Sequence, residues 1–392
     1  MAEHRCLPTP TSPISKPDYD AELLLSLERI NTFNPPVQTC STGWRFAGLY
    51  RGPTSIAYLF FRLSHTHPSL EFKQQSMLEW AEAYLALSAH IKPQRVTAQC
   101  CGVINETLAS LGLQCAMTGD DSLIRQLCAY ETSVNDPRDN GSNEWLYGRA
   151  GYLYLLRMVR ELALSCSSRT RTLLNTTINK TIERILKVPL PWLWHSKPYI
   201  GACHNTIGVV TQILHSNSAY TTRLAPIIQE VLSQQLSSGN FPPSLDSSQG
   251  CHDDRLVQFC HGATGFVLSL QSLLSILPIS SLTPAIEQSI TRARECIRQR
   301  GLLTKPPSLC HGMAGNALAL ADVGDGIRLP DFDVFLSEMT SEKLEARGVW
   351  MARAGHSDDF VGLYDGEAGR AWVWAVAAQE GRKASLIGYN DV

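Results

Sequence analysis

Two short stretches of this 392-residue chain place a thiol directly beside an imidazole, 50 residues apart. They read Phe-Cys-His-Gly-Ala-Thr-Gly from Phe259 to Gly265 and Leu-Cys-His-Gly-Met-Ala-Gly from Leu309 to Gly315. Cysteine thiolate and histidine imidazole share an affinity for borderline-soft cations such as zinc. A single pair of this kind is typical of a buried thiol beside a core histidine, but its duplication favours a metal-dependent site.

The two stretches are members of a repeat that runs along the whole chain. Turns that contain glycine, or asparagine in one case, open apolar helix-like runs at positions 52, 102, 148, 205, 262, 312 and 366. Each apolar run is followed by an amphipathic one, such as residues 170–188, where leucine and isoleucine recur at helical spacing. A period near 50 residues with two helical patterns per unit predicts seven helical hairpins.

The polarity within each unit predicts how the hairpins pack. The helix after each turn is apolar nearly all round, whereas its partner has one polar face. This contrast favours an all-α fold, a double-layered α/α barrel with buried inner helices and outer helices that expose one face. The turn glycines would then adopt positive φ and reverse the chain at the barrel mouth, where Cys260, Cys310 and His311 could meet. An open solenoid of the same units is the alternative architecture.

The chain divides into a short arm and one large domain. Residues 1–18 are rich in proline, serine and threonine and lack an apolar period, so we expect a flexible or loosely docked N-terminal arm. Residues 19–392 are expected to form a single barrel domain. Hydrophobic residues make up 44% and charged residues 18% of the chain, as in globular proteins with a large core.

Charge and hydropathy restrict the partners and the compartment. A net charge of −2 without a basic cluster gives no footprint for nucleic acid or for a membrane surface. The first 16 residues lack the apolar core of a signal peptide, and the longest apolar run, residues 265–279, is too short for a transmembrane segment. We therefore expect a cytoplasmic protein whose 12 cysteines are reduced thiols, core residues or metal ligands.

The repeated residues resemble the lanthionine synthetase C-like (LanC-like) family, in particular its eukaryotic branch. The resemblance covers nearly the whole chain. The two Cys-His-Gly-x-x-Gly stretches are its most specific part, and further matches are Arg51–Tyr58, Leu146–Tyr152 and Tyr364–Gly369. The resemblance implies a double-layered α/α barrel with a catalytic zinc ion in its cavity. It also implies addition of a thiol to a dehydroamino acid, with glutathione as the thiol in eukaryotic members.

The resemblance implies a role for particular residues. The zinc ligands are Cys260, Cys310 and His311, and this set leaves the fourth tetrahedral position open, as in catalytic zinc sites. A substrate thiol that enters this position loses its proton and becomes the nucleophile. His204 matches the histidine that exchanges a proton with the reacting carbons, although Asn205 stands where the family usually has glycine.

Further positions carry supporting roles. His261 follows a ligand in the sequence and is expected to support the site or to shuttle a proton. Glu144 lies near an acidic residue of the bacterial cyclases, and it also suits a carboxylate at a helix start. Lys305 and Arg353 lie where basic residues of the family meet the carboxylates of glutathione. Cys203 is expected to be a core thiol.

Three functions are compatible with these residues. The first is zinc-dependent addition of glutathione or a similar thiol to an electrophilic alkene, in a dehydrated peptide or in a small metabolite. The alternative is a non-catalytic adaptor or sensor that binds zinc and glutathione. A third interpretation, glycoside hydrolysis, requires two carboxylates across the cavity, for which the turns offer Glu144, Asp365 and Glu367. It would leave the Cys-His pairs without a role.

Overall fold

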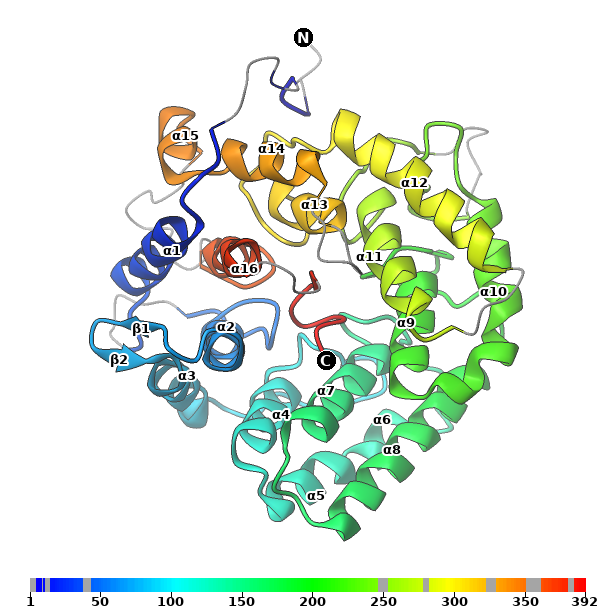
Figure 1. Ribbon diagram of the computed structural model, residues 1–392. Helices are drawn as coiled ribbons and strands as arrows, with labels where there is room; N and C mark the ends of the chain where they lie inside the picture. Colours follow the sequence, from blue (N-terminus) through cyan, green and yellow to red (C-terminus); the bar gives the residue numbers. More distant parts are fainter. Residues whose placement is uncertain are drawn as a thin grey trace.

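The protein forms a closed ring of helices in two concentric layers (Figure 1). The computed structural model describes residues 5–8, 10, 15–37, 44–245, 253–277, 282–321, 329–349, 361–379 and 384–392. Within these ranges helices dominate, and the strands form one short antiparallel pair, β1 (Glu71–Phe72) and β2 (Gln75–Ser76). The predicted all-α double-layered barrel is confirmed, and the open solenoid is excluded because the ring closes.

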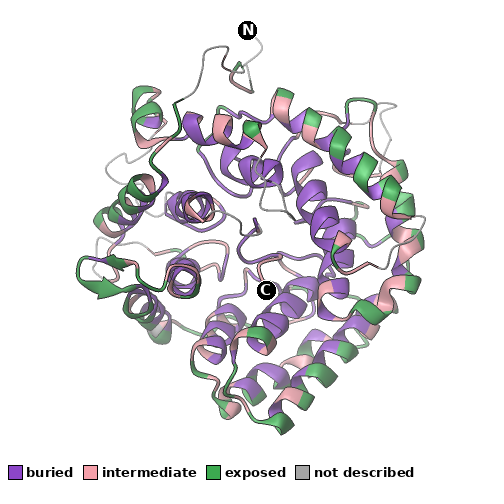
Figure 2. Ribbon diagram, viewed as in Figure 1, coloured by how far each residue is buried: buried purple, intermediate pink, exposed green. Residues whose placement is uncertain are grey.

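The inner layer, over the described ranges, contains seven helices. They are α2 (Pro53–Thr66), α4 (Glu106–Thr118), α7 (Arg149–Leu162), α9 (Thr206–Ser216), α11 (Ala263–Leu274), α13 (Met313–Leu320) and α16 (Glu367–Ala378). Each packs against the next in this order, and α16 packs against α2, which closes the ring. These helices are buried nearly all round (Figure 2), and in α11 every residue from Ala263 to Leu273 is buried. No helix in the described part of the chain is long and apolar enough to cross a membrane.

The outer layer consists of helices that each cover the inner helix before them. They are α3 (Met77–Ala86), α5 (Asp121–Ala129), α8 (Ser168–Leu186), α10 (Thr221–Ser233), α12 (Leu282–Arg300) and α14 (Pro330–Glu338). In α8 one stripe faces the core and the rest faces solvent (Figure 2), because its buried residues recur at helical spacing, among them Leu174, Ile178, Ile182 and Ile185. Short helices complete the connections: η1 (Leu87–His90), α6 (Glu131–Val134), η2 (Ser218–Tyr220) and α15 (Ser341–Ala346).

The seventh hairpin joins the two ends of the chain. α1 (Tyr19–Phe33) packs outside α16 and is therefore the outer partner of the last inner helix. Leu23, Leu27 and Ile30 of α1 are buried. The fully buried guanidinium of Arg370 in α16 lies 3.1 Å from the carboxylate of Glu22 in α1, a contact between residues 348 positions apart. Closure of the barrel thus depends on both ends of the chain.

Backbone hydrogen bonds join the turns that precede the inner helices. We call these turns the turn ring and define it by the two residues before the N-cap of each inner helix: positions 50–51, 103–104, 146–147, 203–204, 260–261, 310–311 and 364–365. N–H groups in or beside one turn donate to carbonyl oxygens of the next at Leu49–Val103 (2.9 Å), Cys101–Tyr147 (2.7 Å), Trp145–Cys203 (3.3 Å), Cys260–Cys310 (3.3 Å), Cys310–Tyr364 (2.9 Å) and Tyr364–Tyr50 (3.0 Å). Between the fourth and fifth turns the backbones are in contact, since a Cβ on Gly201 would lie 2.2 Å from the Cys260 oxygen.

The second turn lies three residues later than the glycine pattern predicted. α4 begins at Glu106, and its N-cap is Asn105, whose side chain accepts a hydrogen bond from the Leu108 N–H at 3.1 Å. Gly102 instead allows close packing of the second turn against the third, because a Cβ there would lie 2.3 Å from the Leu146 carbonyl oxygen of the third turn. The glycine pattern misplaced this turn because asparagine can cap a helix without any glycine.

Glycine serves the turns in two ways. Gly262, the N-cap of α11, has φ of 99°, in the region that the sequence predicted for the turn glycines. The glycines that cap α13 and α16 have φ of −120° and −150°, so for them that prediction was wrong, because extended backbone is sufficient there. Gly265 is required for space: a Cβ at this position would lie 2.2 Å from the Phe259 oxygen and 2.7 Å from the Ala202 Cβ.

The last residues of the chain lie at the centre of the ring (Figure 1). We call residues 384–392 the C-terminal tail, and its residues Leu386, Ile387 and Tyr389 are completely buried. The ring centroid of Tyr389 lies 5.0 Å from that of Phe259 and 5.8 Å from that of Trp145, two residues that directly precede turn-ring positions. The tail therefore packs against the side of the turn ring that faces the barrel interior.

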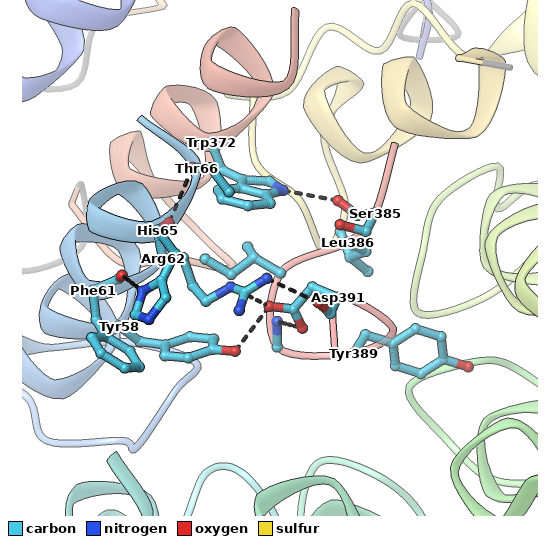
Figure 3. A network of polar contacts seen from close by, with 12 residues as sticks. Tyr58, Phe61, Arg62, His65, Thr66, Trp372, Ser385, Leu386, Tyr389 and Asp391 are labelled. Carbon is cyan, nitrogen blue, oxygen red and sulfur yellow. Dashed lines mark hydrogen bonds and ion pairs between the residues drawn. The ribbon is translucent and has the colours of Figure 1, made fainter. Parts of the chain in front are cut away.

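Polar contacts anchor the tail among buried charges (Figure 3). The Asp391 carboxylate accepts a hydrogen bond from the Tyr58 hydroxyl at 2.8 Å and lies 3.1 Å from Arg62 Nε. The carbonyl oxygen of Tyr389 accepts a hydrogen bond from the buried Arg157 at 2.9 Å. Because an unpaired buried charge costs several kcal/mol, the tail stabilises two arginines that the inner helices carry in the interior.

We expect Gly265→Ala to destabilise the barrel and Gly112→Ala to leave it as stable or more stable. The first substitution forces a methyl group against backbone and should cost about 2–3 kcal/mol. In the second, the new Cβ would lie 3.4 Å from the nearest atom, Met158 Cε, within α4, where alanine gains about 1 kcal/mol of helix propensity. Thermal and urea unfolding midpoints measure both, and equal midpoints for the two variants would contradict the packing argument.

Candidate functional site

Three consecutive turns of the ring carry a Cys-His pair at the same structural position. The pairs Cys203-His204, Cys260-His261 and Cys310-His311 directly precede the N-caps of α9, α11 and α13. Because the turns are joined side by side by their backbones, the three pairs lie next to one another at the barrel mouth. The sequence predicted that the fifth and sixth turns meet, and the structure places the fourth turn beside them.

The thiols of Cys260 and Cys310 are both buried and lie close enough for each to shift the pKa of the other. Gln258 Nε2 donates a hydrogen bond to Cys260 Sγ at 2.9 Å. The interaction with the Cys310 thiol is the main cause that lowers the pKa of Cys260 to about 7, against the effect of burial, and charge on His204 and Lys305 adds to it. The pKa of Cys310 is raised, first by its interaction with the Cys260 thiol and then by burial. Cys260 is thus poised to be the thiolate of the pair.

His311 is a half-buried imidazole on the same turn as Cys310. Burial, followed by the charges of Lys305 and Arg51, lowers its pKa and favours the neutral form that binds metals. Two adjacent thiols and a neutral imidazole are a donor set that zinc prefers, so the predicted residues fit the metal in chemistry. Their three ligand atoms do not all lie within 4.8 Å of one another, so this ligand set stays a prediction.

One trio of potential ligands does come that close within the described residues. It consists of Glu144, Cys203 and His204, whose ligand atoms all lie within 4.8 Å of one another. Cys203 is completely buried, and burial and the nearby carboxylate of Glu144 raise its pKa. The sequence interpretation of Cys203 as a core thiol accounts for its burial but missed its place beside an acid and an imidazole.

His204 is oriented by two neighbours. Its Nδ1 lies 3.3 Å from Oε2 of Glu144, and its ring stacks on the Trp194 indole with centroids 4.0 Å apart and planes at 12°. Glu144 is fully buried and is itself held by hydrogen bonds from the backbone N–H groups of Leu146, at 2.9 Å, and Tyr147. Glu144 therefore caps its own turn, as one of its two interpretations supposed, and also faces His204.

His261 lies between the predicted zinc ligands and the Glu144–His204 pair. Its ring centroid is 5.1 Å from that of His204 and 5.4 Å from that of Tyr199. Burial, and secondly the charge of His204, lowers its pKa to about 3, so His261 is neutral at physiological pH. It can support the site as a hydrogen-bonding group, but it does not supply a cationic acid.

A cationic cavity of about 540 Å³ adjoins the fifth and sixth turns. It is lined by Lys305, Arg5, Arg255, Val257 and Gln258, among others. The N-terminal arm contributes here, because the Arg5 carbonyl accepts a hydrogen bond from the Thr304 N–H at 3.1 Å. The predicted anion-binding Lys305 thus lies in a cavity lined by three basic side chains, one of which, Arg255, pairs with Asp253 at 2.8 Å.

Arg353, the other predicted contact for glutathione, lies outside the residues that the structure describes. The carboxylates proposed for glycoside hydrolysis have structural partners: Glu367 pairs with Arg370 at 2.7 Å, and Asp365 pairs with Arg51. Together with the backbone contacts of Glu144, these pairs leave the glycosidase interpretation without support from the site.

Sequence reasoning missed Trp194, Gln258 and Tyr50. Tyr50 and Cys310 lie close enough for each side chain to shift the pKa of the other. Alignment of the turns by their helix starts would have identified it, because Tyr50 precedes its N-cap by the same two residues as Cys310. No such signal exists for Trp194 or Gln258, which approach the site from segments outside the repeated positions.

Comparison with known proteins agrees with the fold. Residues 43–381 match the family described as lanthionine synthetase C-like protein. A zebrafish (Danio rerio) protein named glutathione S-transferase LANCL1 is 26% identical over 324 residues, which cover 76% of this chain and 72% of the relative. The Arabidopsis thaliana LanC-like protein GCL1 is 25% identical over 259 residues, which cover 61% of this chain and 56% of the relative.

We expect Asn205→Ala to destabilise the protein more than Asn205→Gly. Asn205 adopts φ of 87°, where a Cβ costs about 1–2 kcal/mol unless the residue is glycine or, at lower cost, asparagine. Its amide also donates a hydrogen bond to the Trp192 carbonyl, which both variants lose. Thermal unfolding of the two variants separates the contributions. A glycine variant as unstable as the alanine variant would show that the hydrogen bond, not the backbone conformation, dominates.

Proposed function

The chain belongs to the lanthionine synthetase C-like family, and we propose that it is a zinc-dependent enzyme that adds a thiol to an electrophilic alkene. The observation that carries this proposal is the proximity of the buried thiols Cys260 and Cys310, on turns joined by a 3.3 Å backbone hydrogen bond that adjoin the Glu144–His204 pair. We propose glutathione as the thiol, supported by the name of the zebrafish relative. A dehydroamino acid in a peptide, or a small metabolite with a comparable alkene, is the proposed acceptor.

We propose that Cys260, Cys310 and His311 hold the zinc ion. When bound by such a set, zinc stabilises the thiolate form of a substrate thiol at neutral pH. The low pKa of Cys260 and the neutral state of His311 support this assignment, because metal ligands bind in their deprotonated forms. The other two histidines of the three Cys-His turns, His204 and His261, are left for proton transfer and support.

Thiol addition forms a sulfur–carbon bond at one alkene carbon and delivers a proton to the other. We propose that His204 exchanges this proton. With Nδ1 facing Glu144, the free nitrogen Nε2 can hold the proton for the substrate. The buried carboxylate of Glu144 fixes the orientation of the ring and stabilises the imidazolium that forms when His204 accepts a proton.

The cationic cavity is the proposed binding site for the two carboxylates of glutathione. Lys305, Arg5 and Arg255 line it, and Gln258 connects it to Cys260. The described cysteines are all free thiols, as expected in a reducing compartment where glutathione is abundant. We therefore also propose that the protein acts in the cytoplasm.

Metal analysis of single alanine variants tests the ligand set. We expect the purified protein to hold about one zinc ion per chain, and Cys260→Ala, Cys310→Ala and His311→Ala to lose most of it, since a catalytic zinc site needs all three protein ligands. His204→Ala and His261→Ala should retain zinc. Loss of zinc in His204→Ala with retention in Cys310→Ala would instead assign the metal to the trio of Glu144, Cys203 and His204.

Mass spectrometry of a reaction mixture tests the activity. Zinc-loaded protein, glutathione and a dehydroalanine peptide should give a thioether adduct, and His204→Ala should slow its formation about 100-fold or more while zinc is retained. His65→Ala is the matched control, because His65 is an exposed histidine in the last turn of α2, away from the turn ring. Tight glutathione binding without any adduct would favour the non-catalytic adaptor over the enzyme.

A further inference from the structure

The third and fourth turns bring three different ligand groups together, next to the turns of the proposed zinc ligands. The carboxylate of Glu144, the thiol of Cys203 and the imidazole of His204 offer ligand atoms that all lie within 4.8 Å of one another. Glu144 and Cys203 are completely buried, and the side chain of His204 is 12% exposed. The proposed thiol addition uses the carboxylate and the imidazole but gives the Cys203 thiol no role.

The spacing of Glu144 and His204 matches that of two ligands on one metal ion. Oε2 of Glu144 lies 3.3 Å from Nδ1 of His204, and Nδ1 is a buried atom without a hydrogen-bond partner in the described part of the chain. Zinc binds carboxylate oxygen and imidazole nitrogen at about 2.0–2.2 Å, so two such ligands in a tetrahedral set lie about 3.3–3.5 Å apart. The two atoms therefore already have the separation that a shared zinc ion requires.

Neighbouring groups orient all three ligands. Two backbone N–H groups of its own turn donate hydrogen bonds to the Glu144 carboxylate. The Trp194 indole stacks on the face of the His204 ring with planes at 12°, so the Nδ1 lone pair, which lies in the ring plane, stays directed past the indole. The Cys203 carbonyl accepts the Trp145 N–H at 3.3 Å, which joins the turn of Cys203 to that of Glu144. Contacts of this kind hold metal ligands in position.

The donor set suits zinc, but it is weaker than the set of Cys260, Cys310 and His311. Thiolate, imidazole and carboxylate are all ligands that zinc accepts in proteins. Only one of the three donors is a thiolate, whereas the other set offers two. A metal ion also has to displace the proton of the buried Cys203 thiol, and this requirement lowers the affinity further.

We propose that Glu144, Cys203 and His204 form a second metal site, which binds zinc when zinc is in excess and thereby inhibits the proposed thiol addition. On binding, the Cys203 thiol releases its proton, and its sulfur, a carboxylate oxygen of Glu144 and Nδ1 of His204 bind the ion. His204 then keeps its proton on Nε2 and has no lone pair to accept another, so it no longer exchanges a proton with the substrate. The inhibition rests on the proposed function, whereas the binding of metal does not.

Equilibrium dialysis against Cd²⁺ tests the site directly, since bound thiolate gives a near-ultraviolet charge-transfer band with this ion. The wild type should bind a second ion at a higher Cd²⁺ concentration than the first, and the second ion should add the smaller band because it engages one thiolate. Cys203→Ala should lose the second ion. The double variant Cys260→Ala/Cys310→Ala should lose the first ion and keep the second, with the band of a single thiolate.

Thioether formation at increasing Zn²⁺ tests the inhibition. Free zinc is set with a metal buffer, because glutathione itself binds zinc through its thiol. The wild type should lose activity in excess zinc. Cys203→Ala should be as active as the wild type at low zinc, and it should need at least about tenfold more free zinc for the same inhibition, because it lacks one ligand of the second site.

Cys115→Ala is the matched control. Cys115 is a completely buried cysteine in the second half of α4, away from the turn ring. Its alanine variant should bind both Cd²⁺ ions and should be inhibited by zinc like the wild type. Cys203→Ser keeps the side-chain size and tests the site in case Cys203→Ala does not fold.

The outcomes separate this inference from the proposed function. If the wild type forms no thioether at any zinc concentration, the proposed function fails, and dialysis still decides whether the second site exists. If both Cys203 variants bind as much Cd²⁺ as the wild type and are inhibited at the same free zinc, the inference alone is overturned. If the Cys203 variants lose the first ion and the double variant retains it, the trio is the primary metal site, and this result overturns both the second site and the ligand set of the proposed function.

Discussion

The closure of the turn ring is the constraint on which the rest of this structure depends. Backbone hydrogen bonds of 2.7–3.3 Å link six of the seven junctions between the described turns, and close backbone contact links the seventh. Backbone groups form these bonds regardless of side chain, so the ring leaves the residues one and two before each N-cap free to vary. Several of these positions carry polar and ionisable side chains. Three adjacent turns have cysteine and histidine there, and the two turns that follow around the ring have a tyrosine, Tyr364 or Tyr50.

Such a ring is stable only if the barrel below it is filled and closed. The inner helices are short and apolar, yet α2 and α7 carry Arg62 and Arg157 into the interior. The C-terminal tail offsets their charge through Asp391 and the Tyr389 carbonyl, and the Tyr389 ring packs under Phe259, the residue before Cys260. The tail and α1 both come from the ends of the chain. We therefore expect closure of the ring, filling of the barrel interior and support of the site to form together, in one cooperative event.

The architecture could be predicted from the sequence, because the burial pattern of the helices and the length of the repeat are properties of each repeat by itself. The number of hairpins, the buried inner helices and the adjacency of Cys260 and Cys310 could all be predicted in this way. The second turn could not, because its cap is Asn105 and its glycine serves contact with a different turn. Trp194 and Gln258 were also beyond prediction, since their positions follow from three-dimensional packing and not from any repeated position in the chain.

The fourth and fifth turns differ in the surroundings of their histidines. His204 faces the buried carboxylate of Glu144, whose Oε2 lies 3.3 Å from Nδ1 of the ring. At His261, one turn further, burial and the charge of His204 favour the neutral ring. At Cys260 the neighbouring thiol, glutamine and positive charges favour the anion. His204 contributes to both shifts, because its charge lowers the pKa of His261 and of Cys260. The electrostatics of the two adjacent turns are therefore coupled through His204.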